Sequence, residues 1–320
     1  MIQGGDRYIR VSVLIFIFLT GVMSVNAWGF YGHARINELS VYTLPKPLFG
    51  FYKANVDYMT FHAADADKRR YSDTAEACRH YMDGDHYEYA APFDTVPHYY
   101  SLAIEKYGKD TIIGHGIVPW HIMHMYYRLI EAFKVKDVKR ILSISADLGH
   151  YVGDCHVPLY ATSNYNGQKT GQRGIHALWE SRITEMYFDT YDMLTGLSTY
   201  LENPGKTIWE AYGRSFSLVD SVLKLEKLVS RRFKFQDKYN WEDRGSTIVR
   251  IYSDKFCRAY HLALNDMVEE RIRASVIVLG SLIYTAWIQA GQPDLDQMPI
   301  EDVPTIFPEK EKMIGRGEED

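Results

Sequence analysis

Apolar residues recur at intervals of three and four along most of this chain, which is the pattern of amphipathic helices packed against a core. The clearest runs cover residues 137–159, 176–201, 212–233 and 243–290. Turn-forming residues interrupt the pattern at 44–47, 65–85 and 164–174. No run alternates between apolar and polar residues like a half-buried strand, and no Gly/Ser/Pro-rich linker divides the chain. The pattern predicts an all-α fold, a single-domain multi-helix bundle over residues 28–300.

The first 27 residues have the parts of an export signal and are set apart from the fold. Arg7 and Arg10 precede an apolar run of secretory length, and Val25 and Ala27 supply small residues at the −3 and −1 positions of a cleavage site. This predicts a signal peptide over residues 1–27 and an exported protein, periplasmic or extracellular. An uncleaved anchor helix is the alternative, but the apolar run is shorter than the roughly 20 residues of a spanning helix.

The other long apolar segment lies near the C-terminus, at residues 274–290. It contains Ser281, Thr285 and Gln289, and we predict a buried helix rather than a membrane span. We therefore expect no stable membrane anchor. Residues 301–320 are charged and poor in apolar side chains, which predicts a frayed tail.

Composition narrows the class of protein further. With 46% hydrophobic and 24% charged residues among 320, the chain can build a substantial core, which excludes a disordered protein or a small disulfide scaffold. A formal net charge of −5 excludes a global basic field of the kind that binds nucleic acid without sequence preference. Cys78, Cys155 and Cys257 have no spacing that selects a pair, so we expect unpaired, partly buried thiols.

Two histidines are each followed four residues later by a carboxylate, which places both side chains on one face of a helix. The pairs are His150 with Asp154 and His176 with Glu180. Either pair could share a metal ion, although chance alone gives about 1.5 such pairs in a chain with 12 His and 41 Asp and Glu. His80, in the sequence RHYMDGD, adds another histidine beside carboxylates. Nitrogen and oxygen donors without paired thiolates suit zinc in an open catalytic site.

Five motifs, in this order along the chain, resemble those of a known superfamily. They are WGFYGH at 28–33, AD at 64–65, HYMD at 80–83, HYVGDCHVPL at 150–159 and GIHALWE at 174–180. The superfamily joins bacterial zinc-dependent phospholipases C with the single-strand-specific zinc nucleases of fungi and plants. The resemblance implies an almost all-helical fold that holds three zinc ions at the bottom of a cleft.

The resemblance assigns ligands to two of these zinc ions. The first would take Asp65, His80, His150 and Asp154. The third would take Trp28, through its amino nitrogen and carbonyl oxygen, His33 and a bridging Asp154. A free α-amine has a pKa of about 8, so it can bind metal in neutral water. Asp65 is preferred over Asp67 because it lies fifteen residues before His80, and Asp65 and Asp154 are the expected catalytic carboxylates.

The second zinc site departs from the family pattern. Its expected ligands are His176, Glu180 and a histidine six residues after Asp154, but that position is Tyr160 in this sequence. A phenol is a rare zinc ligand because it must lose a proton of pKa about 10, although a metal lowers that value. His156 is no easy substitute, because two residues from Asp154 it points to another side of the helix. The site is therefore either weakened or completed by a water molecule.

The resemblance implies metal-assisted hydrolysis of a phosphodiester. A hydroxide shared by the first and third zinc would attack phosphorus in line, while the second zinc would offset charge on the leaving oxygen. Tyr81 and Asp83 stand where the nucleases bind a base by stacking and hydrogen bonding, but the phospholipases have a similar pattern. The expected substrate is single-stranded nucleic acid or phospholipid, and no protein partner is expected.

The alternative is a secreted zinc- or phosphate-binding helical protein with a degraded metal cluster and little turnover. Tyr160 favours this alternative, whereas the presence of the other expected ligands favours the enzyme. Metal content separates the two hypotheses, since two or three zinc ions per chain would support an enzyme and one or none a binding protein.

Overall fold

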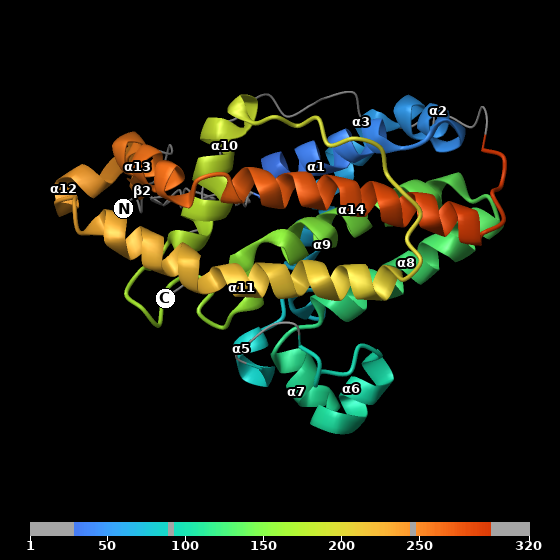
Figure 1. Ribbon diagram of the computed structural model, residues 1–320, viewed down its shortest axis with the longest axis horizontal. Helices are drawn as coiled ribbons and strands as arrows, with labels where there is room; N and C mark the ends of the chain where they lie inside the picture. The colour runs from blue at the N-terminus through green and yellow to red at the C-terminus, as the bar shows by residue number, and fades with distance from the viewer. Residues whose placement is uncertain (1–28, 89–92, 244–247, 296–320) are drawn as a thin grey trace, which may run out of the picture.

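The structure, a computed structural model, describes residues 29–88, 93–243 and 248–295. The expected signal peptide (1–27), Trp28 and the charged tail (301–320) lie outside the described residues. Within the described ranges nearly all regular structure is helical, and the exception is a two-stranded antiparallel sheet (Figure 1). The predicted all-α, single-domain architecture is confirmed for this part of the chain.

Long helices form the body of the bundle. They are α1 (Gly29–Thr43), α8 (Val118–Lys134), α9 (Val138–His156), α11 (Pro204–Ser230) and α14 (Met267–Gln289). The shorter α-helices are α2 (Lys46–Ala54), α3 (Val56–Phe61), α4 (Asp65–Arg69), α5 (Gly84–Tyr87), α6 (Tyr100–Tyr107), α7 (Lys109–Gly114), α10 (Thr184–Tyr187), α12 (Phe235–Lys238) and α13 (Asp254–Leu264). Short 3₁₀ segments are η1 (His62–Ala64), η2 (Ala77–Arg79), η3 (Pro158–Ala161) and η5 (Phe188–Thr190), and η4 (Ala177–Ile183) is a π-helix. The hairpin pairs β1 (Tyr239–Asp243) with β2 (Ile248–Tyr252).

Helix α9 runs through the middle of the bundle, and its second half is enclosed on every side. It packs against α1, α8, α11 and α14 (Figure 1). Asp137 caps its first turn by accepting a hydrogen bond from the backbone N–H of Arg140 (3.1 Å). Every residue from Leu148 to His156 is buried. Because this half of α9 has no solvent face, its polar residues need partners inside the protein.

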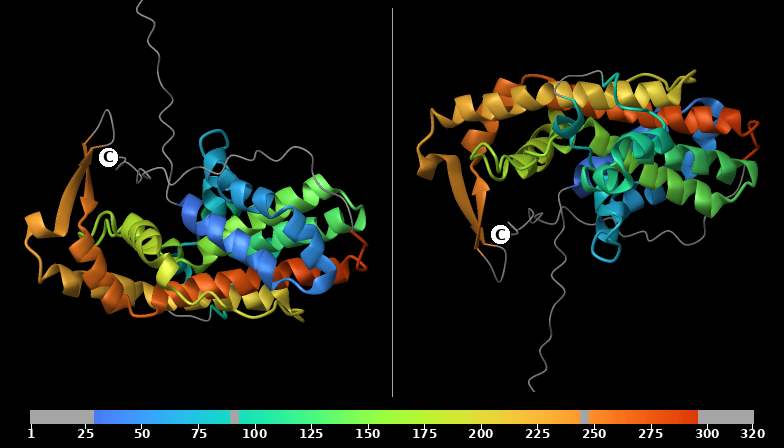
Figure 2. Two further views of the ribbon diagram at one scale, coloured as in Figure 1. Left: turned by 90° about the horizontal axis from the view of Figure 1, so that it is seen from above. Right: turned by 90° about the horizontal axis from the view of Figure 1, so that it is seen from below.

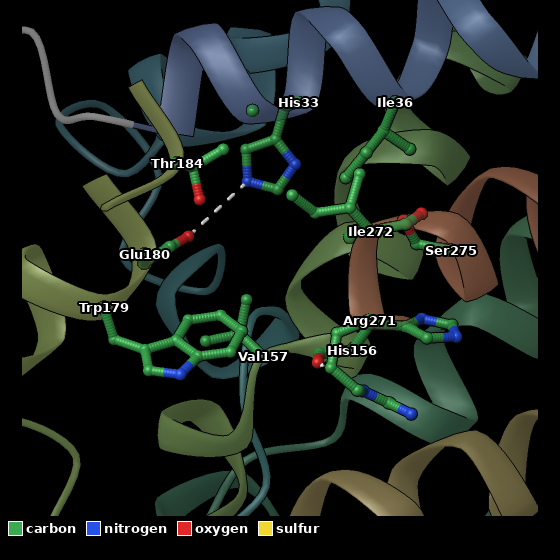
Figure 3. A pocket seen from close by; sticks show the side chains of 12 residues that line it. His33, Ile36, His156, Val157, Trp179, Glu180, Thr184, Arg271, Ile272 and Ser275 are labelled. Carbon is green, nitrogen blue, oxygen red and sulfur yellow. Dashed lines mark hydrogen bonds and ion pairs between the residues drawn. The ribbon is translucent and has the colours of Figure 1, made fainter. Parts of the chain in front are cut away.

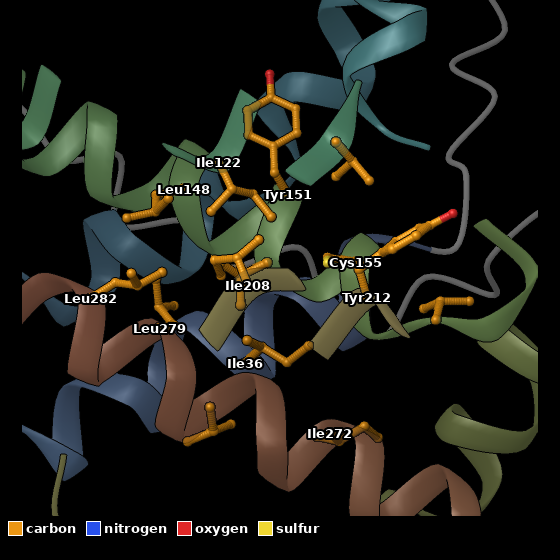
Figure 4. Close-up of a cluster of buried hydrophobic side chains, with 14 of the residues drawn as sticks. Ile36, Ile122, Leu148, Tyr151, Cys155, Ile208, Tyr212, Ile272, Leu279 and Leu282 are labelled. Carbon is orange, nitrogen blue, oxygen red and sulfur yellow. The ribbon is translucent and has the colours of Figure 1, made fainter. Parts of the chain in front are cut away.

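Apolar side chains from the surrounding helices meet α9 in one continuous core. Figure 4 shows Leu148, Tyr151 and Cys155 of α9 with Ile36 of α1, Ile122 of α8, Ile208 and Tyr212 of α11, and Leu279 of α14. Each fully buried aliphatic side chain of this size contributes about 1.5–3 kcal/mol to stability. The three cysteines are also buried and unpaired, as predicted.

Two glycines of α9 allow α1 to approach closely. A methyl group on Gly149 would lie 1.8 Å from Oδ1 of Asn37, and one on Gly153 would lie 2.6 Å from Nδ1 of His33. The side-chain amide of Asn37 also donates to the backbone carbonyl of Ala146 (3.1 Å), which ties α1 to α9. The two glycines are four residues apart on α9, and Asn37 and His33 are four residues apart on α1. The two close contacts therefore fix the register of α1 along α9 and the position of His33.

A buried arginine from α14 caps the C-terminal end of α9. Nε of Arg271 donates to the carbonyl oxygen of His156 (2.9 Å). One terminal nitrogen of the same guanidinium donates to the carbonyl of Ala211 (2.9 Å) and to the hydroxyl of Ser215 (2.7 Å) on α11. Burial lowers the pKa of Arg271 to about 10, so the side chain stays charged at neutral pH. The cation offsets the partial negative charge of the last carbonyls of α9.

Helix α14 belongs to the same core. Among the described helices it is the one long and apolar enough to cross a membrane, yet 61% of its most apolar stretch is buried. It packs against α1, α8 and α9. This is the packing of a core helix, as the sequence predicts for residues 274–290.

The helix predicted over 176–201 ends early. After Thr190 the chain is extended and crosses over α14 (Figure 1). The hydroxyls of Ser281 and Thr285 accept hydrogen bonds from the backbone N–H groups of Thr199 (3.1 Å) and Leu201 (2.9 Å). These side chains satisfy an extended backbone, which apolar periodicity alone does not reveal.

The run predicted as helix over 243–290 begins with the hairpin instead. Residues 248–252 have the sequence IVRIY, and β-branched and aromatic residues of this kind favour strands. Helix follows from Asp254 and breaks at Asn265, whose φ is +53°. Pro204 lies in the first turn of α11, where Asn203 caps the helix by accepting a hydrogen bond from the backbone of Lys206 (3.0 Å).

We expect Gly149→Ala to lower the free energy of unfolding by about 1–3 kcal/mol, because the added methyl group overlaps Asn37 and pushes α1 away from α9. Gly50→Ala is the matched control. This glycine of α2 has open space where a side chain would lie, so alanine should raise stability by up to about 1 kcal/mol. Urea denaturation of the metal-free protein measures both, and equal stability of the two variants would contradict the tight α1–α9 contact.

Candidate metal centre

A cluster of buried histidines and aspartates lies where α9 meets α1 and the segment 62–80. Its members are His33, Asp67, His80, His150 and Asp154. The ligand atoms of His33, His150 and Asp154 lie within 4.8 Å of one another, and so do those of Asp67, His80 and His150. This group, named here the central cluster, could hold metal ions.

His150 is oriented by a backbone carbonyl. Its Nδ1 lies 2.9 Å from the carbonyl oxygen of Ala63, and because a carbonyl only accepts, this nitrogen carries the proton. Nε2 faces the central cluster, 3.0 Å from Nδ1 of His80 and 3.3 Å from Oδ2 of Asp154. A carbonyl partner of this kind fixes the ring orientation of metal-binding histidines.

Asp154 stands between two groups of histidines. Its Oδ2 is 2.9 Å from Nδ1 of His80 and 3.3 Å from Nε2 of His150. Its Oδ1 is 3.3 Å from Nε2 of His33 and accepts no hydrogen bond from the described part of the chain. A buried carboxylate oxygen without a donor is costly unless a cation lies beside it. Asp154 therefore has the placement of a ligand that two ions could share.

The carboxylates of the central cluster stay ionised despite their burial. Burial alone raises the pKa of Asp154, but His150, His33 and His80 outweigh it and hold that pKa well below its usual value. The same balance of burial against His150 and His80 lowers the pKa of Asp67. Burial lowers the pKa of His150, yet Asp154 and Asp67 overcome this and raise it to about 9. The cluster therefore attracts positive charge, which protons or metal ions can supply.

The aspartate at the central cluster is Asp67, whereas the motif spacing selects Asp65. Oδ1 of Asp67 lies 3.8 Å from Nδ1 of His80. Asp65 is partly exposed and pairs instead with His62 and Lys68. Both aspartates lie on α4, where residues two apart point to different sides of the helix, so only one of them faces α9. The structure thus brings Asp67, and not Asp65, to the central cluster.

The residues expected at the second zinc site adjoin the central cluster. Nε2 of His176 is 2.7 Å from Oε2 of Glu180, but neither ring nitrogen of His176 makes a hydrogen bond among the described residues. The rings of His176 and Tyr160 meet edge to face, with centroids 4.7 Å apart. Oε1 of Glu180 lies 3.9 Å from Nε2 of His33, and Figure 3 shows this pair facing each other beside a small pocket. The structure therefore brings all three expected residues together, with Glu180 facing His33.

The two expected substrate-binding residues follow His80 in a loop. The hydroxyl of Tyr81 donates to a backbone carbonyl (3.4 Å). Oδ2 of Asp83 lies 3.2 Å from Nδ1 of His115, whose ring stacks on that of His86 with centroids 3.4 Å apart. Burial raises the pKa of Asp83. Asp83 therefore lies beside two stacked imidazole rings that the motifs did not point to.

Glu76 supports the central cluster, although no motif selects it. Its carboxylate is fully buried and accepts hydrogen bonds from Arg79 (2.5 Å), Arg69 (3.5 Å) and the hydroxyl of Tyr151. Oε1 faces Nε2 of His80 at 3.6 Å. Burial raises the pKa of Glu76, but these partners outweigh it and the net shift is downward. A carboxylate behind a ligand histidine orients the ring and makes it more basic. The four-residue spacing of Glu76 and His80 is the signal that could have revealed it.

Comparison of the sequence with models of known protein families gives no match, and comparison with curated proteins gives none either. The structure establishes buried His and Asp groups that could hold a metal ion. The functional argument therefore rests on the geometry of these groups and on the resemblance of the sequence motifs.

Replacing a residue that only supports a metal ligand weakens metal binding by about 10–100-fold. We expect Asp67→Asn to weaken zinc binding by more than this, because it removes a negative oxygen from the central cluster. Asp65→Asn is the matched control on the same helix and should leave the affinity unchanged. Competition with a chromophoric chelator measures the affinity of each variant. The opposite order of effects would restore Asp65 as the ligand.

Glu76→Gln should lower zinc affinity by about 10–100-fold, because it removes the negative charge behind His80. Asp147→Asn serves as its control, since Asp147 also pairs with Arg69 (3.0 Å) but makes no contact with His80 among the described residues. The same chelator competition measures both variants. Unchanged affinity, with only the stability of the metal-free protein reduced, would show that Glu76 acts on the fold and not on His80.

Proposed function

We propose that the protein is an exported, zinc-dependent phosphodiester hydrolase of the phospholipase C and single-strand nuclease superfamily. The observation that carries the proposal is the position of Asp154. One of its carboxylate oxygens faces His80 and His150, and the other faces His33. A carboxylate shared in this way suits two neighbouring ions, which phosphodiesterases use to stabilise the attacking and leaving oxygens. The order of the motifs along the chain supports the same superfamily.

The donor atoms suit zinc. Imidazole nitrogens and carboxylate oxygens without thiolates are typical of catalytic zinc sites. One ion would be held by Asp67, His80, His150 and Asp154. A neighbouring ion would be held by His33 and Asp154, with Trp28, outside the described residues, as the expected further ligand. His176 and Glu180 offer a third position, which is weaker because Tyr160 replaces a histidine.

Zinc held in these positions would act as a Lewis acid toward a phosphoryl oxygen and lower the pKa of water. The residues of the chain prepare the site for this chemistry. Asp154 holds the two histidine groups together, while Ala63 and Glu76 orient the rings of His150 and His80. Burial strengthens every charge interaction among these residues, because the effective dielectric constant there is lower than in water.

The proposed substrate is a phosphodiester, either a phospholipid or single-stranded nucleic acid. Tyr81 offers an aromatic face on which a base could stack, which suits nucleic acid. The alternative function, a secreted zinc- or phosphate-binding protein with little turnover, is favoured by Tyr160, since loss of a histidine ligand weakens one metal position.

The test uses the chain from Trp28 onward, loaded with zinc, on phosphatidylcholine and on single-stranded DNA in parallel. We expect release of phosphocholine or of nucleotides, full inhibition by a chelator, and a loss of about 100-fold or more in Asp154→Asn. Asp65→Asn is the control and should retain activity. Two or more bound zinc ions without hydrolysis of either substrate would refute the hydrolase and support the alternative of a secreted binding protein.

A further inference from the structure

The hairpin and α12 lie at one end of the molecule (Figure 2), and they carry large exposed apolar side chains. Phe235 is 61% exposed, and Trp241 and Ile248 are each 67% exposed. Trp241 pairs with Arg250 across the hairpin, and Asp243 with Ile248. Because alternate residues of a strand share a face, Trp241, Asp243, Ile248 and Arg250 lie on the same face of the hairpin, where the carboxylate of Asp243 offsets the charge of Arg250.

Arg250 joins α12 to this face of the hairpin. Its guanidinium lies over the ring of Tyr239 at 4.5 Å and over the ring of Phe235 at 6.0 Å. The exposed side chains therefore form one continuous patch, named here the hairpin surface. Its members are Phe235, Tyr239, Trp241, Ile248 and Arg250.

Basic residues gather beside the hairpin surface, although the whole chain is acidic. Residues 224–238 contain six Lys and Arg against Glu226 and Asp237, a local net charge of +4 in a chain of −5. Glu226 is buried and already paired with Lys238 (2.8 Å). The exposed basic residues are Lys224, Lys227, Arg231, Arg232 and Lys234, and none of them forms an ion pair within the described chain.

Helix α11 explains only part of this basic group. Cations in the last turn of a helix stabilise its dipole, and that effect fades beyond the last turn. Lys227 lies in the last turn of α11, but Arg232 and Lys234 follow the helix. Their proximity to Phe235 in sequence places positive charge directly beside exposed apolar surface. That combination of aromatic, aliphatic and basic residues is typical of proteins that bind the interface of an anionic membrane.

A membrane fits this surface better than single-stranded nucleic acid does. Nucleic acid without sequence preference is bound in a basic groove where aromatic rings stack on the bases. Ile248 cannot stack on a base, and the hairpin projects from one end of the molecule (Figure 2). The strands that carry Trp241 and Ile248 can instead bring these side chains into the headgroup region of a bilayer.

The hairpin surface is connected to the metal centre. The hydroxyl of Tyr252, the last residue of β2, donates to the carbonyl of Arg173 (3.3 Å), three residues before His176. Arg182 of η4 pairs with Asp254 of α13 (2.7 Å). The segment that carries His176 therefore packs directly against the structure that supports the hairpin.

We propose that the hairpin surface and its neighbouring basic residues dock the protein on anionic phospholipid membranes, and that the metal centre acts on a phospholipid of that membrane. The choice of substrate rests on the proposed function, whereas docking does not. Docking at this end would place the membrane on the side of the centre that carries His176.

The first test measures binding of the metal-free chain from Trp28 onward to vesicles, with and without phosphatidylglycerol in phosphatidylcholine. We expect binding that requires the anionic lipid and weakens with salt. The double variant Arg231→Glu/Arg232→Glu should bind about tenfold or more weakly, and Trp241→Ser/Ile248→Ser should also lose binding. Lys139→Glu/Arg140→Glu is the control, because it makes the same change of charge at the exposed start of α9.

A second measurement places the hairpin in the bilayer. Trp241 is the exposed tryptophan of the described chain, because Trp120, Trp179, Trp209 and Trp287 are buried. Brominated phospholipids should therefore quench part of the fluorescence of the bound protein. In a Trp28→Phe background, which removes the tryptophan outside the described residues, Trp241→Phe should abolish that quenching while the protein still sediments with the vesicles.

Several outcomes would overturn the proposal. They are absence of binding to anionic vesicles, hairpin variants that lose only oligonucleotide binding, and hairpin variants that change the oligomeric state measured by sedimentation. Hydrolysis of the soluble diester bis(p-nitrophenyl) phosphate by the zinc-loaded protein tests the proposed function separately. Docking without that activity would refute the hydrolase alone, and activity without docking would refute the docking alone.

Discussion

Asp154 lies on the half of α9 that is buried on all sides, and several features of the fold stabilise its carboxylate. An ionised group in that position has lost its water and requires positive charge from the protein or from a metal. His80, His150 and His33 approach it from two directions, and the glycines of α9 leave the room that His33 needs. The histidines thus stabilise the negative charge of Asp154, which would otherwise oppose folding.

The C-terminal end of α9 is capped by a second buried charge that has its partners inside the protein. Arg271 is a buried cation without a carboxylate partner in the described chain, and it satisfies backbone carbonyls and a hydroxyl instead. Its charge lies at the end of the helix that carries Asp154, where it adds to the favourable potential around that side chain. Arg271 thereby links α14 to α9 and α11 by polar contacts as well as by apolar packing.

The sequence predicts those features of the fold and of the site that depend on regular, uninterrupted helix. His150 and Asp154 lie on an uninterrupted helix, so their four-residue spacing translates directly into a shared face. Asp65 and Asp67 could not be separated in this way, because counting residues through the short turns of segment 62–80 does not define which side of α4 faces the cluster. The extended chain after Thr190 is held by Ser281 and Thr285, about eighty residues away, and periodicity carries no information about such distant partners. Glu76 is a different case, because its four-residue spacing from His80 is a local signal that the sequence does contain.

The order of the cluster residues along the chain has a consequence for assembly. His33 comes from the first described helix, Asp67 and His80 from the irregular segment after it, and His150 and Asp154 from the middle of the chain. His80 and His150, whose rings touch, are separated by 70 positions. Closing loops of that length costs conformational entropy, and no short fragment contains the complete set of donors. A metal ion would therefore bind and stabilise the bundle only after its helices have assembled, and it would not nucleate folding. The metal content of a preparation would then report the fraction of molecules that has reached the native fold.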